Sequence, residues 1–304
     1  MKLLRELKIK IYSHIFNKTI SNLTKNSTSC FLVPQGLGDI LFFLMFVKAY
    51  REKNPSEKIA ICVTKNGFLN LAELFSDELD FILYFPSLLN YNNIVNDKLI
   101  YLHPKIYNPN DKQQNLLDSV RNAMGLKKDV ERFIPNVNFM NNEVQEIDRI
   151  INNENKIALI APDATSCSKL INDKEWCELA DFLIKNGFRV YFNIGEKNRF
   201  CGYQKIYLSI KQTIYFCNKI KIFIGYRSGL CDVVAAFCSC EQFIFFPNNR
   251  QQIECDYILN YDTNPNVAYK NYVSLKAMFP EKNIHEFILS KNRLLLDFKE
   301  EFNG

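Results

Sequence analysis

The sequence predicts an α/β protein made of two doubly wound halves, each with its own parallel sheet. Short apolar runs alternate with longer helical stretches along most of the chain, which is the pattern of successive strand–helix–strand units. This pattern weakens between residues 90 and 136 and then begins again. The length of 304 residues also favours two domains, at about 150 residues each.

The first half contains three predicted strands separated by helices. The strands are predicted at Cys30–Val33, Lys58–Val63 and Phe81–Phe85, and the helices between them at Asp39–Arg51 and Leu69–Leu74. Two further helices follow at Gln113–Met124 and Glu143–Asn152. We place the domain boundary near residue 150, so the first domain spans residues 29–150.

The second half repeats this order more clearly. Its strands are predicted at Ile157–Ala161, Arg189–Ile194, Ile220–Ile224 and Gln242–Phe246, and its helices at Glu175–Asn186, Ser209–Cys217 and Gly229–Phe237. Both halves are therefore Rossmann-like, and the second domain spans residues 151–304. A final helix, Lys291–Phe302, has no obvious strand partner and could cross back to the first domain.

The positive charge of the chain is concentrated at its N-terminus. The formal net charge is +5, and residues 1–25 hold six basic residues against one acidic residue. The rest of the chain carries 32 residues of each sign, so the folded body is neutral. A nucleic-acid-binding protein would need a basic groove across its folded surface, and we therefore exclude this class.

The basic arm, residues 1–28, has the pattern of an amphipathic helix. An apolar stripe recurs at steps of three and four residues, at Leu4, Leu7, Ile11 and Ile15. Lysines around such a stripe suit an anionic membrane surface, which is one interpretation. The other is a helix packed on the neighbouring domain with solvated lysines, since Ile9 and Phe16 lie off the stripe.

The cysteines and the apolar segments indicate the cytoplasm. The ten cysteines lie mostly inside apolar runs such as Ile59–Val63, where a reduced thiol behaves as a small hydrophobe. The arm lacks the uninterrupted apolar stretch of a signal peptide, and no segment reaches the roughly 18 apolar residues of a membrane span. We expect a cytoplasmic protein that can associate peripherally with the inner face of the membrane through its arm.

We expect no metal site. Cys238 and Cys240 have the wrong spacing for a zinc site, and neither a CxxC motif nor a pair of neighbouring histidines occurs elsewhere. The DxD motif of metal-dependent sugar transfer is also absent from the sequence.

The segment Gln35–Asp39 follows one predicted strand and begins a helix. Gly36 and Gly38 allow a sharp turn close to a ligand, and a helix N-terminus offers free amide groups. As a dinucleotide fingerprint the segment fails, because Leu41 stands where the third glycine belongs. Asp39 is either a helix N-cap or a general base at the cleft between the domains.

The segment Ile224–Leu230 also runs from a strand through a turn into a helix. Ser228 can cap this helix while the amides of Gly229 and Leu230 point at an anion. Arg227 adds a permanent charge that can hold a phosphate with two hydrogen bonds. These residues predict a diphosphate site, and the alternative is a capped turn with a surface arginine.

A third loop, Pro162–Lys169, follows the first strand of the second half. Its hydroxyl groups and the amine of Lys169 suit a phosphate or hydroxyl ligand. Trp176, the one tryptophan of the chain, is predicted to anchor the following helix in the core.

Together these three segments resemble glycosyltransferase family 9, the heptosyltransferase-like enzymes with the two-domain GT-B fold. The resemblance covers Phe31 to about Pro247. It is most specific in GLGD at residues 36–39, in the spacing from Lys169 to Trp176, and in FIGYRSGL at residues 223–230.

The resemblance implies an inverting, metal-independent transfer, with the acceptor bound mainly by the first domain and a nucleotide sugar by the second. Asp39, on the acceptor-side loop of Gly36 and Gly38, would be the base that deprotonates the acceptor hydroxyl. The implied acceptor is a bacterial surface glycan, of lipopolysaccharide, lipooligosaccharide or capsule. No cofactor other than the donor substrate is implied.

The donor site implied by the resemblance consists of Lys169, Glu196, Arg227, Ser228, Gly229 and Leu230. Among them, Lys169, Ser228 and Gly229 would hold the diphosphate. Glu196 would reach the nucleoside.

Four positions depart from the family pattern. The family often has Asp or Asn before the Ser/Thr-Gly-Leu run and His soon after it, where this chain has Arg227 and Asp232. Phe42 and Met45 replace a His and a Pro that are common in heptosyltransferases. We therefore do not assume that heptose is the sugar transferred.

Two other interpretations stay open. One is a non-catalytic GT-B-like module that binds a nucleotide or a glycan, in which Asp39 is only a cap. The other is a dinucleotide-dependent oxidoreductase, which Leu41 disfavours.

Overall fold

The computed structural model describes most of the chain. The described residues are 2–25, 28–33, 36–85, 99–101, 116–151, 156–164, 171–196, 198–246, 274–289 and 294–302. The chain divides into two compact units. Unit 1 holds residues 1–108 and 116–136, and unit 2 holds residues 109–115 and 137–304.

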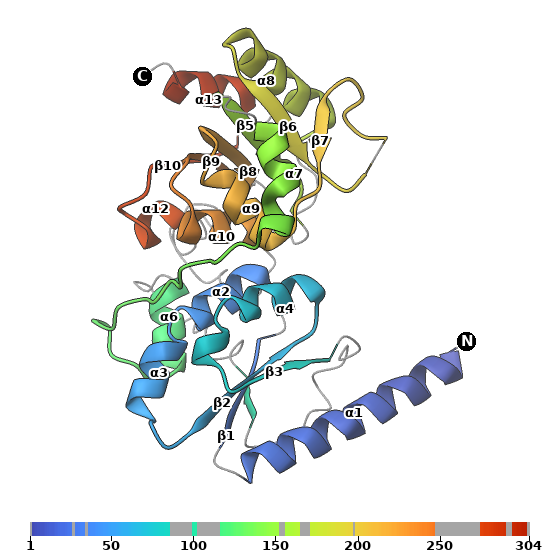
Figure 1. Cartoon of the computed structure of the whole chain (residues 1–304), viewed down its shortest axis with the longest axis vertical. Coiled ribbons are helices and arrows are strands. Elements are labelled where there is room, and N and C mark those ends of the chain that lie inside the picture. The colour runs from blue at the N-terminus through green and yellow to red at the C-terminus, as the bar shows by residue number, and fades with distance from the viewer. Residues whose placement is uncertain are drawn as a thin grey trace, which may run out of the picture. The chain divides into compact units, whose positions relative to one another are not determined.

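Unit 1 is built on a parallel sheet with the strand order β3-β2-β1-β4 (Figure 1). Its strands are β1 (Thr28–Leu32), β2 (Lys58–Val63), β3 (Phe81–Tyr84) and β4 (Leu99–Tyr101). Its helices are α1 (Lys2–Thr24), α2 (Leu37–Leu44), α3 (Val47–Lys53), α4 (Asn66–Glu73) and α6 (Leu116–Ala123), with a short 3-10 helix, η1, at Ser76–Glu78.

Different helices cover the two faces of this sheet. Cys30 of β1 packs with Phe16 and Ile20 of α1. Its neighbour Phe31 points to the opposite face and packs on Phe43 of α2, with 4.7 Å between the ring centroids. Because side chains alternate along a strand, this apolar run buries both of its faces.

The helix predicted at Asp39–Arg51 is divided into α2 and α3. Every side chain from Ile40 to Val47 is buried, so the apolar pattern has no polar face that would mark the break. At the break, the amide of Phe133 donates to the carbonyl of Met45 at 2.8 Å. A distant segment therefore satisfies a backbone group that the interrupted helix leaves open.

Unit 2 is built on a larger parallel sheet with the strand order β10-β9-β8-β5-β6-β7. Its strands are β5 (Ile157–Ala161), β6 (Arg189–Asn193), β7 (Gln204–Ile206), β8 (Ile222–Tyr226), β9 (Glu241–Phe246) and β10 (Ile284–Ile288). Its helices are α7 (Asn141–Ile151), α8 (Asp173–Lys185), α9 (Ile210–Cys217), α10 (Gly229–Phe237), α12 (Leu275–Met278) and α13 (Leu294–Phe302). The sequence did not predict β7 and β10, the two edge strands, because they lack a continuous apolar run.

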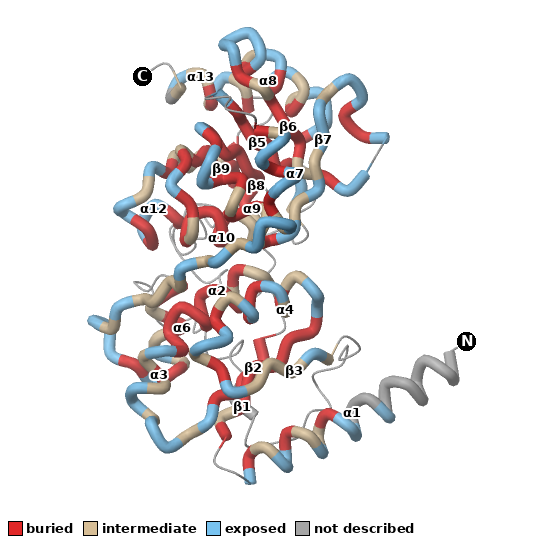
Figure 2. The backbone as a smooth tube through the Cα atoms, in the orientation of Figure 1, coloured by how far each residue is buried: buried red, intermediate tan, exposed pale blue. Residues whose placement is uncertain are grey.

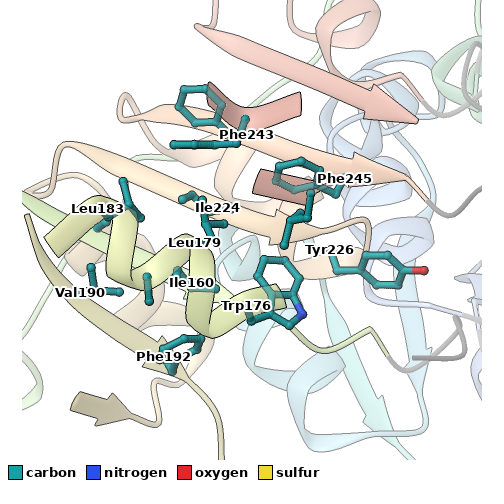
Figure 3. Packing of buried hydrophobic residues seen from close by; sticks show 14 of the residues in the cluster. Ile160, Trp176, Leu179, Leu183, Val190, Phe192, Ile224, Tyr226, Phe243 and Phe245 are labelled. Carbon is teal, nitrogen blue, oxygen red and sulfur yellow. The ribbon is translucent and has the colours of Figure 1, made fainter. Parts of the chain in front are cut away.

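The core of unit 2 lies between its sheet and helix α8. Trp176 of α8 is fully buried, and its ring centroid lies 6.3 Å from that of Phe245 on β9 (Figure 3). Strands β5, β8 and β9 are buried along almost their whole length (Figure 2). The prediction that Trp176 anchors its helix is confirmed.

Helices α7 and α13 both belong to unit 2. On α7, Asp148 accepts hydrogen bonds from Tyr215 of α9 at 2.8 Å and from Lys219 at 3.0 Å. The division therefore falls before α7, whereas the sequence placed the boundary at its end. Phe298 of α13 packs on Phe182 of α8 with 6.1 Å between centroids, so α13 does not cross back to the first unit.

Helix α1 combines features of both interpretations of the arm. Phe16 and Ile20 are fully buried against the sheet of unit 1, although the sequence placed Phe16 off the apolar stripe. Ile11 and Ile15, two members of that stripe, are 50% and 47% exposed. The helix thus packs through one face and exposes part of its stripe on another. None of the helices in the described ranges is long and apolar enough to cross a membrane.

Candidate active site

Each sheet has a topological switch point, where successive strands pass to opposite sides of a central strand. In unit 1 the chain adds β2 and β3 on one side of β1 and then β4 on the other. In unit 2 it adds β6 and β7 on one side of β5 and then β8 on the other. Open α/β sheets bind ligands at such points, outside the carboxyl ends of the strands.

The predicted segments lie at these switch points. The turn that carries Asp39 follows β1, the central strand of the first switch. The turn that carries Ser228 follows β8, and Asp163 follows β5. Since Ala161 pairs with Gly225 of β8 and Ile160 with Phe192 of β6, the ends of these three strands are level. Unit 2 therefore gathers residues from three loops at one edge.

Asp39 lies in the first turn of α2, but it is not the helix N-cap. Gly36 holds the N-cap position, and Asp39 follows inside the helix. An added side-chain carbon at Gly36 would lie 2.9 Å from Oδ2 of Asp39, so the carboxylate lies back over the glycine. The residue is half-buried, at a helix end where the dipole favours a negative charge. The N-cap interpretation of Asp39 is wrong, and its carboxylate lies beside the turn.

The turn after β8 is fixed by close packing. A side-chain carbon at Gly225 would lie 2.7 Å from Sγ of Cys231 and 2.9 Å from Cε1 of Phe223. The thiol of Cys231 donates to the carbonyl of Tyr226 at 3.3 Å, which ties the helix back to the strand. Only glycine fits at position 225 without displacing a buried neighbour.

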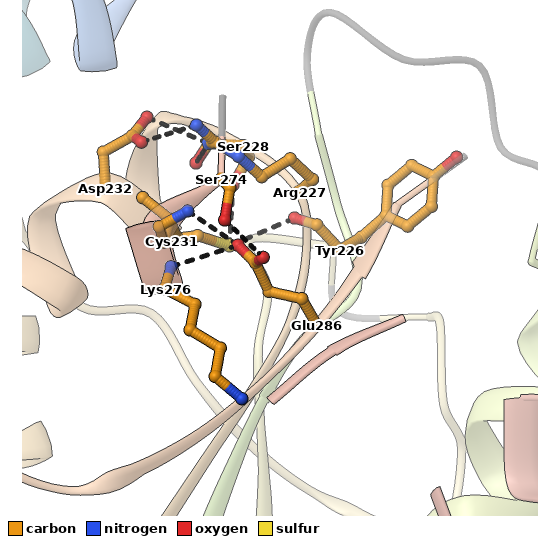
Figure 4. Close-up of polar contacts among 9 residues, drawn as sticks. Tyr226, Arg227, Ser228, Cys231, Asp232, Ser274, Lys276 and Glu286 are labelled. Atoms are coloured by element: carbon orange, nitrogen blue, oxygen red, sulfur yellow. Dashed lines mark hydrogen bonds and ion pairs between the residues drawn. The ribbon is translucent and has the colours of Figure 1, made fainter. Parts of the chain in front are cut away.

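Arg227 and Asp232 form a buried ion pair within this turn (Figure 4). The two end nitrogens of the guanidinium donate to the two oxygens of Asp232, at 2.7 and 3.0 Å. One of them also donates to the carbonyl of Ser228 at 2.9 Å. The side chains are only 7% and 4% exposed, so the interpretation of Arg227 as a surface arginine is wrong.

The two departures from the family pattern at positions 227 and 232 belong together, because the two side chains form one ion pair. Burial raises the pKa of the Asp232 carboxyl, and the adjacent Arg227 guanidinium acts in the opposite direction. The two end nitrogens of Arg227 both bind Asp232, so we interpret Arg227 as a residue that stabilises the turn, and we call this ion pair the brace of the turn. A direct phosphate contact by Arg227, as predicted from the sequence, has less support from this geometry.

The helix end beyond the brace keeps its polar groups near the surface. Ser228 occupies the N-cap position of α10, but its hydroxyl makes no capping hydrogen bond. That hydroxyl lies 3.7 Å from Sγ of Cys231. Ser228, Gly229 and Leu230 are all half-buried, and the first amides of a helix have no acceptor within it. This helix end is suited to an anion.

The remaining predicted site residues have different positions. Glu196 is exposed on the loop after β6. Lys169 lies outside the described residues, so its predicted role stays a prediction. Gly38 is buried in the first turn of α2.

Arg199, on the same loop as Glu196, was not predicted from the sequence. Its buried guanidinium hydrogen-bonds Asp163 and Asp173, one on each side of the loop that contains Lys169. An arginine between Asn198 and Phe200 gives no sequence signal of burial. Asp163 and Asp173 are far from it in the chain.

Of the cysteines that the structure describes in unit 2, four are core residues, whereas Cys177 is half-buried and Cys201 is exposed. Cys217, Cys231, Cys238 and Cys240 are buried and free of disulfides. Within the described part of the chain, no group of three or more His, Cys, Asp or Glu residues could hold a metal ion.

Comparison with known proteins gave matches in structure only. Neither a protein-family model nor a curated protein matches the sequence. A glycosyl transferase family 9 structure from Veillonella parvula DSM 2008 is 11% identical, with a TM-score of 0.58 over 91% of this chain and 88% of that one. The chain has the GT-B fold.

Two Escherichia coli structures match the same fold over a similar length. Heptosyltransferase WaaC with ADP-2-deoxy-2-fluoro heptose is 12% identical, with a TM-score of 0.56 over 91% of this chain and all (100%) of that one. ADP-heptose LPS heptosyltransferase II is 10% identical, with a TM-score of 0.56 over 90% and 99%. The predicted GT-B fold and the resemblance in fold to family 9 are thus confirmed.

Proposed function

We propose that this chain is an inverting, metal-independent glycosyltransferase of the family 9 type. It would move a sugar from a nucleotide-sugar donor to a bacterial surface-glycan acceptor. The main support is that the two loops with the predicted chemistry lie at the switch points of the two sheets. One loop presents the carboxylate of Asp39, and the other a braced helix end at Ser228.

On the acceptor side, Asp39 acts as general base. It takes the proton of the acceptor hydroxyl as the oxygen attacks the anomeric carbon of the donor sugar. The bond between that carbon and the diphosphate oxygen breaks, and the diphosphate leaves with the electron pair. Attack from the face opposite the leaving group inverts the anomeric configuration.

On the donor side, the charge that develops on the diphosphate is stabilised by preorganised donors. The amides of Gly229 and Leu230 and the hydroxyl of Ser228 lie at the helix end, and Lys169 adds a positive charge. Glu196 contacts the nucleoside. In this proposal these groups replace a metal ion at the leaving group.

Thermal stabilisation by a panel of ADP, UDP, GDP, CMP and NAD tests this proposal first. A nucleotide at about 100 times its dissociation constant adds roughly 2.7 kcal/mol to the stability of the protein that binds it. We expect one nucleoside diphosphate to raise the melting temperature and Lys169→Ala to abolish that rise. ADP comes first, since one protein with this fold is named for ADP-heptose and another was solved with ADP-2-deoxy-2-fluoro heptose.

A second measurement separates an enzyme from a binding module. We expect slow hydrolysis of the matching nucleotide sugar without acceptor, lost in Lys169→Ala. Nucleotide binding without any turnover would favour a non-catalytic module. Stabilisation by NAD alone would overturn the assignment.

We further propose that the protein works at the cytoplasmic face of the membrane, to which α1 brings it. Ile11 and Ile15 are exposed although Phe16 and Ile20 of the same helix are fully buried. The arm also carries the whole excess positive charge of the chain. Exposed apolar side chains among lysines suit an anionic lipid surface.

Substitution of the exposed stripe tests this without harming the core. Deletion of the arm would be misleading, because Phe16 and Ile20 cover one face of the sheet. Instead, Ile11→Ser with Ile15→Ser is compared with the similarly exposed pair Ile184→Ser and Leu296→Ser of unit 2.

We expect only the α1 pair to weaken sedimentation with vesicles of phosphatidylglycerol and phosphatidylcholine. The melting temperature of unit 1 should change little. Equal sedimentation of wild type and both variants would contradict membrane binding through α1.

A further inference from the structure

Arg199 joins two elements at the carboxyl edge of the second sheet. Its side chain is 7% exposed. Nε and one end nitrogen donate to Asp173, at 2.9 and 2.7 Å, and the other end nitrogen donates to Asp163. Asp163 lies two residues after the end of β5, and Asp173 is the first residue of α8. One side chain therefore holds both ends of the connection between β5 and α8.

The position of Arg199 is itself fixed by its neighbours. Phe200 has φ of 54°, in the left-handed region that non-glycine residues rarely adopt. Its ring stacks on Phe192 of β6, with centroids 4.1 Å apart and planes 9° apart. Lys205 donates to the carbonyl of Arg199 at 3.1 Å. Such a conformation persists only where the surrounding structure imposes it, and it recurs at ligand clamps.

The charges at this point also matter for an anionic ligand. The side chains of Asp163 and Asp173 are each 48% exposed, so two carboxylates lie at the surface of this edge. The hydrogen bonds to Asp173 make the largest contribution to raising the pKa of Arg199, and the hydrogen bond to Asp163 adds to it. The guanidinium therefore stays charged. Without the guanidinium, a phosphate bound nearby would meet two uncompensated negative charges.

We propose that Arg199 is a positioning residue for the nucleotide: it holds the ends of the loop between Asp163 and Asp173 and shields their carboxylates. The loop includes Lys169, and Arg199 also belongs to the loop of Glu196. The arginine acts through both loops and does not touch the ligand. This inference rests on the proposed nucleotide site.

Arg199→Gln tests the inference, with Arg189→Gln as a matched control. Arg189 is the first residue of β6, whereas Arg199 lies on the loop that follows the end of β6. Arg189 donates to Gln204 at 3.0 Å and to the carbonyl of Ile150 at 3.4 Å. Both changes remove a hydrogen-bonded arginine from the same unit, but only Arg199 pairs with carboxylates. Arg199→Lys keeps the charge and loses the fork.

We expect two results from Arg199→Gln that Arg189→Gln does not give. Amide hydrogen exchange in peptides covering residues 163–173 becomes faster without any ligand. The dissociation constant of the nucleoside diphosphate that stabilises the wild type rises about ten-fold or more, because Asp163 and Asp173 lose their anchor and repel the diphosphate. With the nucleotide sugar, KM rises more than kcat falls, and Arg199→Lys lies between the two.

Each outcome decides a separate point. If amide exchange is unchanged in Arg199→Gln, Arg199 does not hold the ends of the loop, and this conclusion does not depend on nucleotide binding. Faster exchange with an unchanged dissociation constant overturns the positioning role. If the wild type itself binds none of the nucleotides, the proposed function fails, and the exchange experiment still decides whether Arg199 holds the loop.

Discussion

Two turns of this protein have the same chain order but place their acidic residue in different surroundings. The turn after β1 and the turn after β8 each follow a buried strand, contain glycine and lead into a helix. In unit 1 the acid, Asp39, is half-buried and lies over Gly36. In unit 2 the acid, Asp232, is buried and paired with Arg227.

The difference shows that burial and partners decide the role of a carboxylate. Asp39 is half-buried beside Gly36, and we propose it as the base of the transfer. Asp232 has a guanidinium on both of its oxygens, so its charge stabilises the turn. In the proposed function the first turn supplies the base, and the second supplies a braced helix end suited to an anion.

The largest expected effect is that of Asp39→Asn on transfer. The change keeps the shape of the side chain and removes the base, so we expect kcat to fall about 10²–10⁴-fold. Nucleotide binding, measured by thermal shift, should stay as in the wild type. If Asp39→Asn turns over at the wild-type rate, Asp39 is not the base. The two turns would then not differ in the proposed way.

The second turn should respond through stability. Arg227→Met leaves the buried carboxylate of Asp232 without its partner, which costs about 3–5 kcal/mol. The double change Arg227→Met with Asp232→Leu should recover most of that loss, since no charge is left buried. Chemical unfolding followed by Trp176 fluorescence measures both. A double variant as unstable as the single one would show that the pair matters for packing only.

The two glycines distinguish the turns at a smaller scale. Gly225→Ala forces a methyl group against Cys231 and the ring of Phe223, and we expect a loss of about 1–3 kcal/mol. Among the described residues, the methyl group of Gly36→Ala meets the carboxylate of Asp39, which can swing away. Its stability should therefore change little, while kcat falls about ten-fold as the base moves. Melting curves and transfer assays on both variants test whether Gly225→Ala lowers stability while Gly36→Ala lowers kcat.

The smallest effect should come from the hydroxyl of Ser228. It makes no capping bond, so Ser228→Ala should change stability by less than about 0.5 kcal/mol. The matched control is Ser209→Ala, because Ser209 forms a capping box with Gln212 on α9 and its loss should cost about 1 kcal/mol. Equal losses would show that the Ser228 hydroxyl caps its helix after all. Nucleotide affinity should fall in Ser228→Ala alone.

Much of the fold was readable from local patterns. The buried strands β5, β6, β8 and β9 and the helices between them form at the predicted places, because a buried parallel strand is a continuous apolar run. The edge strands β7 and β10 were missed because neither contains such a run, whereas the apolar edge strand β3 was predicted. The break between α2 and α3 was missed because both helices are buried around Met45.

The candidate site was readable where chemistry and sequence neighbours coincide. Gly36 and Asp39, or Ser228 and Gly229, are adjacent in the chain, and their spacing after a strand indicates a ligand-binding turn. The pairing of Arg227 with Asp232 was not predicted, although both positions were noted as departures. A charge near a helix end gives no sign in the sequence of whether it is exposed or buried.

The sequence by itself determined the α/β class, the repeated strand–turn–helix order and the two glycine turns, because these depend on neighbouring residues and on periodicity. Only the tertiary structure decided which carboxylate is paired, that Arg199 joins Asp163 to Asp173, and that Ile11 stays exposed while Phe16 packs inside. These depend on contacts between residues far apart in the chain, and burial and charge compensation arise only when such residues meet.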